Sequence, residues 1–123
     1  MQETLSPSCM QKLQEQQQVI EMAAELFCVL SAPMRLRIII SLCQAEKNVS
    51  ELLSEINTTQ PNMSQHLNTL YQSQILGKRR DGVQIYYRII DRRVANLCRI
   101  VCNQIAETEH LAMPTPLPPA TPA

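Results

Sequence analysis

The chain has 123 residues, of which 45% are apolar and 18% charged, and its formal net charge is zero. This length suits one domain with a buried core. The absence of an apolar run of membrane length and of a secretory signal predicts a cytoplasmic protein and excludes a membrane-spanning one. The five cysteines are then expected to be reduced, metal-binding or redox-active rather than paired in structural disulfides.

The net charge of zero results from an uneven distribution. Between Lys78 and Arg99 the chain has seven basic and two acidic residues, a local charge of +5, so the remainder carries −5. A local basic segment is enough for contact with phosphate, and the acidic remainder limits non-specific binding. The alternative interpretation of these arginines is a solvated strand and helix face.

The first part of the chain predicts two helices. Residues 1–10 are expected to form a flexible N-terminus, and a long helix is predicted from Lys12 to Leu30. A second helix is predicted to start at Ser31, with Pro33 in its first turn. Its candidate core residues are Leu36, Ile39, Ile40, Leu42 and Cys43. The segment Gln44–Lys47 is expected to be a connector.

Two short helices separated by a tight polar turn are predicted next. Asn48 and Glu51 have the spacing of a capping box at the start of the first one. The second is predicted from Thr59 to Tyr71, with Thr59 as its N-cap and Pro61 in its first turn. Two short helices joined in this way predict a helix-turn-helix.

The predicted helix Thr59–Tyr71 has one apolar face and one polar face without Glu, Lys or Arg. Met63, Leu67 and Leu70 recur at helical spacing and are expected to be buried. Amides and hydroxyls hydrogen-bond base edges and phosphates, and an exposed helix N-terminus favours phosphate. We therefore predict DNA contacts from the residues of the polar face, which are Thr59, Gln60, Asn62, Ser64, Gln65 and His66.

A β-hairpin is predicted after this helix. Gly77 is expected to let the chain turn, and Asp81-Gly82 is a strong hairpin signal. The following residues, Val83–Ile89, largely alternate between apolar and polar side chains, as a half-buried strand does. A hairpin with basic residues is suited to contact phosphate or the minor groove. Its predicted DNA contacts are Lys78, Arg79, Arg80, Gln84 and Tyr86.

The last predicted element is a helix from Arg92 to about Glu109, capped by Asp91. Its apolar stripe consists of Val94, Leu97, Val101 and Ile105. The predicted DNA-binding and dimerisation domain covers residues 11–111. Residues 112–123 are rich in proline, which predicts a disordered tail, with a docking motif as the alternative.

The run from Ala23 to Ile90 resembles the ArsR/SmtB family of winged-helix repressors. The matching segments are LSAPMRLRIIISL at Leu30–Leu42, NVSELL at Asn48–Leu53, TQPNMSQHLNTL at Thr59–Leu70 and GKRRDGVQIYYRI at Gly77–Ile89. The resemblance implies a mainly α winged helix-turn-helix with five helices and a two-stranded wing. It also implies a homodimer built from the first and last helices. A two-fold dimer of this kind is expected to bind an inverted repeat in double-stranded operator DNA.

Family members are dimeric repressors that leave their operator when an inducer binds or when thiols are modified. The chain is therefore expected to be a repressor rather than an enzyme. It has no Cys-x-x-Cys motif, and no third group is evident that would orient a Cys/His pair. A thiol enzyme and a winged helix that contacts only protein are the alternatives to a DNA-binding repressor.

The family's usual metal sites are missing, which leaves the cysteines as candidate sensors. The family's Cys-x-Cys pair would fall at Asn48–Glu51, and the carboxylate and histidine set of the last helix is absent. Cys98 and Cys102 lie four residues apart on the final predicted helix, on one flank of its apolar stripe. Their Cβ atoms are expected to be roughly 5–6 Å apart, whereas a disulfide needs about 3.5–4.5 Å.

Cys43, near the end of the second predicted helix, is the third candidate. The sulfide-responsive members of the family place one cysteine on this helix, at the position of Ile40, and another on the last helix. By this resemblance Cys43, Cys98 and Cys102 are the sensor thiols, and sulfane sulfur, persulfide or an oxidant is the expected signal. A bridge is expected between Cys43 and Cys102 or Cys98.

Two alternatives to thiol sensing stay open. In the first, arsenite or a soft metal ion is the inducer, bound by Cys98, Cys102 and Cys28, and no other cofactor is expected. In the second, the cysteines are small hydrophobic residues of the core or the interface, as free cysteines often are.

Overall fold

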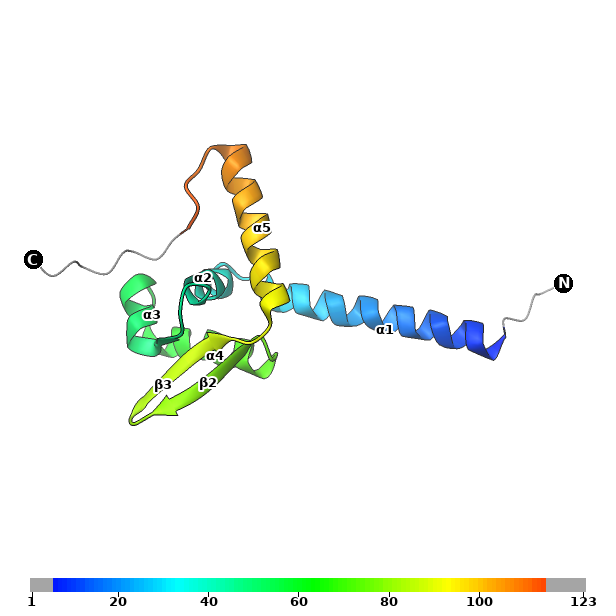
Figure 1. Ribbon diagram of the computed structural model, residues 1–123, viewed down its shortest axis with the longest axis horizontal. Helices are drawn as coiled ribbons and strands as arrows, with labels where there is room; N and C mark the ends of the chain where they lie inside the picture. The colour runs from blue at the N-terminus through cyan, green and yellow to red at the C-terminus, as the bar shows by residue number, and fades with distance from the viewer. Residues whose placement is uncertain (1–5, 115–123) are drawn as a thin grey trace, which may run out of the picture.

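The computed structural model describes residues 6–114, which form five helices and three short strands. The elements are α1 (Pro7–Leu30), α2 (Pro33–Leu42), β1 (Lys47–Asn48), α3 (Val49–Glu55), α4 (Gln60–Gln72), β2 (Leu76–Asp81), β3 (Gln84–Ile89) and α5 (Arg92–Glu109). Helices α2, α3 and α4 pack together beside the hairpin of β2 and β3, and α1 projects away from this body (Figure 1). The predicted winged helix-turn-helix is confirmed.

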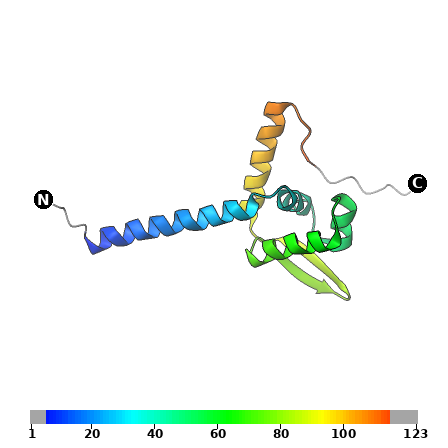
Figure 2. The same ribbon diagram turned by 180° about the vertical axis from the view of Figure 1, so that it is seen from behind.

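The core lies where α2, α3 and α4 meet the start of the hairpin and of α5. Met63, Leu67 and Leu70 are completely buried, as their spacing in the sequence predicted. They pack with Ile38 and Ile39 of α2, of which Ile38 was not among the predicted core residues. Viewed from behind, α4 runs in front of the hairpin (Figure 2). Among residues 6–114, no helix has both the length and the apolarity needed to cross a membrane.

The predicted helix caps are present. The backbone N–H of Glu51 donates to Asn48 Oδ1 over 2.8 Å, and the backbone N–H of Asn48 donates to Glu51 Oε1 over 3.2 Å. Thr59 accepts a hydrogen bond from the backbone of Asn62, and Asp91 accepts one from the backbone of Arg93. These side chains satisfy backbone donors that have no partner inside the helix, and so they fix where each helix begins.

Helix α1 begins earlier than predicted. Ser6 accepts a hydrogen bond from the backbone N–H of Cys9, and Pro7 occupies the first turn, where its missing N–H is harmless. Residues 7–10 are therefore helical, and the predicted start at Lys12 was wrong. The first five residues and residues 115–123, which include most of the predicted proline-rich tail, lie outside the described residues.

The sheet has three strands rather than the two predicted, in the order β1-β3-β2, all antiparallel. In the short strand β1, Lys47 pairs with Tyr87, so the predicted connector ends in a strand. Asp81 pairs with Gln84, which places the hairpin turn at Gly82–Val83, one residue later than predicted. Gly82 has a φ of +63°, which a two-residue turn accepts at its first central position.

Gly77 has a different role from the one predicted. It is buried in β2, where a Cβ atom would lie 2.8 Å from Cγ2 of Ile90, so only glycine fits this close approach. The chain instead turns after α4 at Gln74, which has a φ of +62°.

Candidate nucleic-acid interface

The polar residues of α4 lie on its exposed side. Gln60, Ser64 and Gln65 are exposed, whereas Met63 and Leu67 of the same helix are fully buried. The helix begins after the exposed cap residue Thr59, so its first turn lies at the surface together with these side chains. This arrangement can place amide and hydroxyl groups against base edges and the helix N-terminus against a phosphate.

Two other predicted DNA-contact residues of α4, Asn62 and His66, make hydrogen bonds within the protein. Asn62 donates from Nδ2 to Thr58 Oγ1 over 2.7 Å. His66 is half-buried, and its Nδ1 lies 3.2 Å from Nη1 of Arg35. Because a guanidinium only donates, Nδ1 is the acceptor, and the imidazole is neutral in this contact. Burial and the nearby Arg35 both lower the pKa of His66.

The three cations of the wing have different surroundings. The ammonium of Lys78 lies 4.3 Å from the ring centroid of Tyr71, at the end of α4. Arg79 donates from Nε to both carboxylate oxygens of Glu46, over 2.9 and 3.1 Å, and lies over the ring of Tyr86. The hydrogen bonds from Arg79 lower the pKa of Glu46. Arg80 is exposed and, within the described part of the chain, has no carboxylate partner.

The start of α4 and the tip of the wing share one open depression of about 250 Å³. Gln60 and Gln84, both predicted DNA contacts, line it from α4 and β3. Ser50 of α3 and Val83 of the hairpin turn line it as well, and the side chain of Val83 is almost fully exposed. Neither Ser50 nor Val83 was among the predicted DNA contacts, although the hairpin signal placed Val83 close to the tip.

Two of the three candidate sensor thiols lie on α5, and the third lies at the C-terminal end of α2, which packs against α5. Cys43 follows the last residue of α2 and is half-buried, Cys98 is buried, and Cys102 is half-buried. Burial raises the pKa of Cys98 to about 11, and the nearby Cys102 and Cys43 add to this. Burial also raises the pKa of Cys43, although Arg99 and Arg92 oppose the shift.

The remaining cysteines and the possible metal ligands are more scattered. Cys9 and Cys28 are exposed on α1. In the described stretch from Ser6 to Pro114, no group of three or more His, Cys, Asp or Glu side chains could hold a metal ion.

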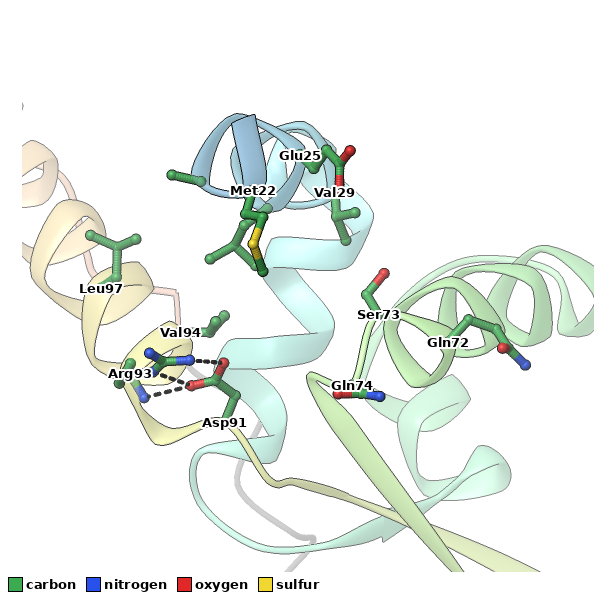
Figure 3. Close-up of a pocket in the computed structure, with 12 residues that line it drawn as sticks. Met22, Glu25, Val29, Gln72, Ser73, Gln74, Asp91, Arg93, Val94 and Leu97 are labelled. Carbon is green, nitrogen blue, oxygen red and sulfur yellow. Dashed lines mark hydrogen bonds and ion pairs between the residues drawn. The ribbon is translucent and has the colours of Figure 1, made fainter. Parts of the chain in front are cut away.

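A second surface lies at the base of α1. A groove of about 750 Å³ runs between α1, the end of α4 and the start of α5 (Figure 3). Met22, Val29 and Leu97 supply apolar side chains to it, and the ion pair of Asp91 with Arg93 lies at its edge. Large apolar side chains are also exposed along both helices, namely Met10, Leu13, Val19, Ile20, Met22 and Phe27 of α1 and Ile100, Val101 and Ile105 of α5.

Comparison with known proteins shows related bacterial regulators. Residues 32–77 match the sequence profile described as "Bacterial regulatory protein, arsR family". The chain is 38% identical over 85 residues to the biofilm growth-associated repressor of Xylella fastidiosa, covering 66% of this chain and 75% of that protein. It is 31% identical over 80 residues to the transcriptional repressor SmtB of Mycobacterium tuberculosis. That alignment covers 65% of this chain but only 59% of SmtB.

Solved structures agree in fold. The repressor BigR from Xylella fastidiosa is 31% identical, with a TM-score of 0.66 over 80% of this chain and 98% of BigR. A homodimeric winged helix-turn-helix domain from Mycobacterium bovis is 25% identical, with a TM-score of 0.65 over 91% of this chain and 94% of that domain. Together with the exposed polar face of α4 and the basic wing, these relatives show that the chain belongs to the arsR family of bacterial regulatory proteins.

Proposed function

We propose that the protein is a transcriptional repressor that binds operator DNA with α4 and the wing. The observation that carries this proposal is the exposed, uncharged polar face of α4, with Gln60, Ser64 and Gln65 directed away from the core. Side chains of this type read base edges in the major groove, while the cations of the wing contact phosphate. Two of the similar proteins, SmtB and BigR, are described as transcriptional repressors.

The proposal includes a homodimer formed through α1 and α5. Monomers rarely expose as many large apolar side chains as these two helices do, so we infer that a second copy of this chain covers them. The related domain from Mycobacterium bovis is described as homodimeric. In a two-fold dimer the two α4 helices would enter successive major grooves about 34–36 Å apart and recognise an inverted repeat.

The experiment uses DNA selected by the protein itself from a randomised duplex library. Gln65→Ala and Ser64→Ala should each weaken binding to the selected sequence by about 1–3 kcal/mol, because each removes a base contact. Binding to random DNA should change little, because it depends mainly on phosphate contacts. Gln44→Ala, at an exposed glutamine outside α4, is the matched control. Equal losses on both DNAs would show that these residues do not read bases.

We further propose that modification of thiols releases the protein from DNA. A thiolate of the chain attacks the outer sulfur of a persulfide, RSSH, which transfers that sulfur and releases the thiol RSH. A second thiolate of the chain then attacks the inner sulfur of the new protein persulfide and releases hydrosulfide, leaving a disulfide. Cys43 and Cys102 are the expected partners, since both are half-buried and α5, which carries Cys102, packs against α2, which Cys43 follows directly.

Cys98 is a poor first nucleophile. With a pKa of about 11 it is almost entirely protonated at neutral pH, and the thiolate is the reactive form. It remains the alternative second partner in the bridge with Cys43.

A further inference from the structure

Arg35 connects the end of α1 to the recognition helix α4. It lies in α2, half-buried, and its Nε donates to the backbone carbonyl of Val29 over 2.6 Å. Its Nη1 lies 3.2 Å from Nδ1 of His66. One side chain therefore contacts the last turn of α1 and the middle of α4.

Both contacts satisfy groups that need a donor. Helix α1 ends at Leu30, so the carbonyl of Val29 is one of the last four, which have no partner within the helix. Nδ1 of a neutral imidazole is an acceptor when the proton is on Nε2. The planar guanidinium presents its donors in a fixed fork, so Nε and Nη1 each serve one of these acceptors in a single side-chain orientation, whereas lysine carries only one nitrogen on a flexible stem.

The position of His66 makes this contact relevant to DNA binding. His66 directly follows Ser64 and Gln65 on α4, and it precedes the buried Leu67. A small rotation of α4 would move the exposed side chains of Ser64 and Gln65 relative to the bases. Such groups must be held within about 0.5 Å of their productive position by a supporting layer of contacts.

We propose that Arg35 is a positioning residue for DNA recognition, which fixes α4 relative to the dimerisation helix α1 through Val29 and His66. This inference rests on the proposed function, since it assigns Arg35 a role in specific DNA binding. The proposal also changes the role of His66. The sequence suggested a base contact, whereas here His66 attaches α4 to α2 through its hydrogen bond with Arg35.

The first test compares two substitutions of His66. Asparagine places an amide oxygen at about the position of Nδ1, so His66→Asn keeps an acceptor for Arg35, whereas His66→Leu removes it. We expect His66→Asn to bind the selected DNA within threefold of the wild-type affinity and His66→Leu to bind at least tenfold more weakly. If His66 instead contacted a base through Nε2, both variants would lose affinity equally, and that result would overturn the proposal.

The second test is a double-mutant cycle with Arg35→Met. Arg35→Met alone should weaken binding to the selected DNA at least tenfold, and adding His66→Leu should then cost less than threefold. If His66→Leu costs the same with and without Arg35, the two residues are not coupled and the proposal is wrong. Thermal unfolding of every variant checks the fold. Arg35→Lys, which keeps the charge but not the fork, replaces Arg35→Met if that variant unfolds.

Selection from the library with the wild-type protein distinguishes a failure of the proposed function from a failure of the role of Arg35. If it selects no sequence from the library, both the proposed function and the role of Arg35 are overturned. If it selects a sequence that the Arg35 and His66 variants bind with wild-type affinity, only the role of Arg35 is overturned.

Discussion

Arg79 donates hydrogen bonds from Nε to both carboxylate oxygens of Glu46, so one of the three wing cations already has a carboxylate partner. Arg80, the next residue of β2, is exposed and pairs with Ile85 across the hairpin. The wing therefore offers DNA an uncompensated charge at Arg80 and a compensated one at Arg79. This difference was invisible in the run Lys78-Arg79-Arg80, where both arginines were predicted to contact phosphate.

We predict that Arg80→Ala reduces the salt dependence of DNA binding more than Arg79→Ala does. Loss of one phosphate contact should lower the slope of log K against log salt by roughly one unit. Glu46→Gln should strengthen binding to random DNA, because it frees the charge of Arg79. Lys12→Ala is the control, because Lys12 belongs to the first turns of α1, and this helix projects away from the hairpin (Figure 1). Equal slopes for all four variants and the wild type would remove the wing from the interface.

Local patterns predicted the helices and their caps, because periodicity and capping depend on residues a few positions apart. The capping box of Asn48 and Glu51 and the buried face with Met63 are examples. The pairs Arg79–Glu46 and Arg35–His66 join residues more than thirty positions apart. Whether such side chains meet depends on how the helices pack, and no local signal in the sequence indicates it.

The start of α1 and the strand β1 were also not predicted correctly from local sequence patterns. Ser6 and Pro7 have the pattern of a helix start. The segment after them is polar and rich in glutamine, so its sequence did not indicate that the helix continues from Pro7 onward. Strand β1 has only two residues, and it exists because Lys47 and Asn48 pair with β3. Its partner strand lies almost forty positions later, so the strand could not be predicted from local alternation.

The second prediction concerns a buried ion pair that the sequence did not reveal. Nζ of Lys47 lies 2.8 and 2.9 Å from the two carboxylate oxygens of Glu55 and 2.9 Å from the hydroxyl of Ser41. Glu55→Leu would leave the buried ammonium unpaired, and we expect a loss of about 3–5 kcal/mol in the free energy of unfolding. The double variant Lys47→Met/Glu55→Leu should be much more stable than Glu55→Leu.

Urea denaturation at one fixed protein concentration measures both effects, since the stability of a dimer depends on concentration. Glu109→Leu, at an exposed carboxylate at the end of α5, is the control and should change the free energy by less than about 0.5 kcal/mol. A double variant as unstable as Glu55→Leu would show that the unpaired charge is not the cause.

The third prediction concerns the pH dependence of stability at His66. Burial and Arg35 hold the pKa of His66 below its ordinary value of 6.5, so below this pH the unfolded chain binds more protons than the folded one. The free energy of unfolding should therefore decrease as the pH falls from about 6.5 through the lowered pKa.

His66→Asn has no titrating group at this position, so its stability should decrease less over the same pH range. The carboxylates of Glu46 and Asp91, whose pKa values are also lowered, lose their contribution only in more acidic solution and in both proteins alike. Denaturation of both proteins between pH 7.5 and about pH 5 measures the difference. Parallel curves would contradict the assignment of a neutral, half-buried imidazole to His66.

The fourth prediction concerns the dimer. Val101 and Asn103 are both exposed on α5, but only Val101 belongs to its apolar stripe. Val101→Glu should therefore shift the protein towards the monomer, and Asn103→Glu should leave the dimer intact. Sedimentation at micromolar concentration should give about twice the chain mass of 14.0 kDa for the wild type and Asn103→Glu. A monomeric wild-type protein that binds an inverted repeat tightly would contradict the proposed assembly.

The last prediction concerns the thiol switch. A bridge between Cys43 and α5 is possible only while α2 and α5 hold one relative position, and α5 is part of the proposed dimer interface. The bridge would therefore alter the spacing of the two α4 helices, and a difference in affinity of about 1.4 kcal/mol already corresponds to tenfold. We expect a persulfide to join Cys43 to Cys102, or to Cys98, within one subunit and to lower operator affinity at least tenfold.

Cys43→Ser should bind DNA normally and not respond, whereas Cys9→Ser, which removes an exposed thiol of α1, should respond like the wild type. Intact mass and peptide mapping identify the bridge, in parallel with a DNA shift assay. If Cys43→Ser responds normally to persulfide while Cys98→Ser and Cys102→Ser lose a response to arsenite, the bridge is wrong and the soft-metal alternative explains the release.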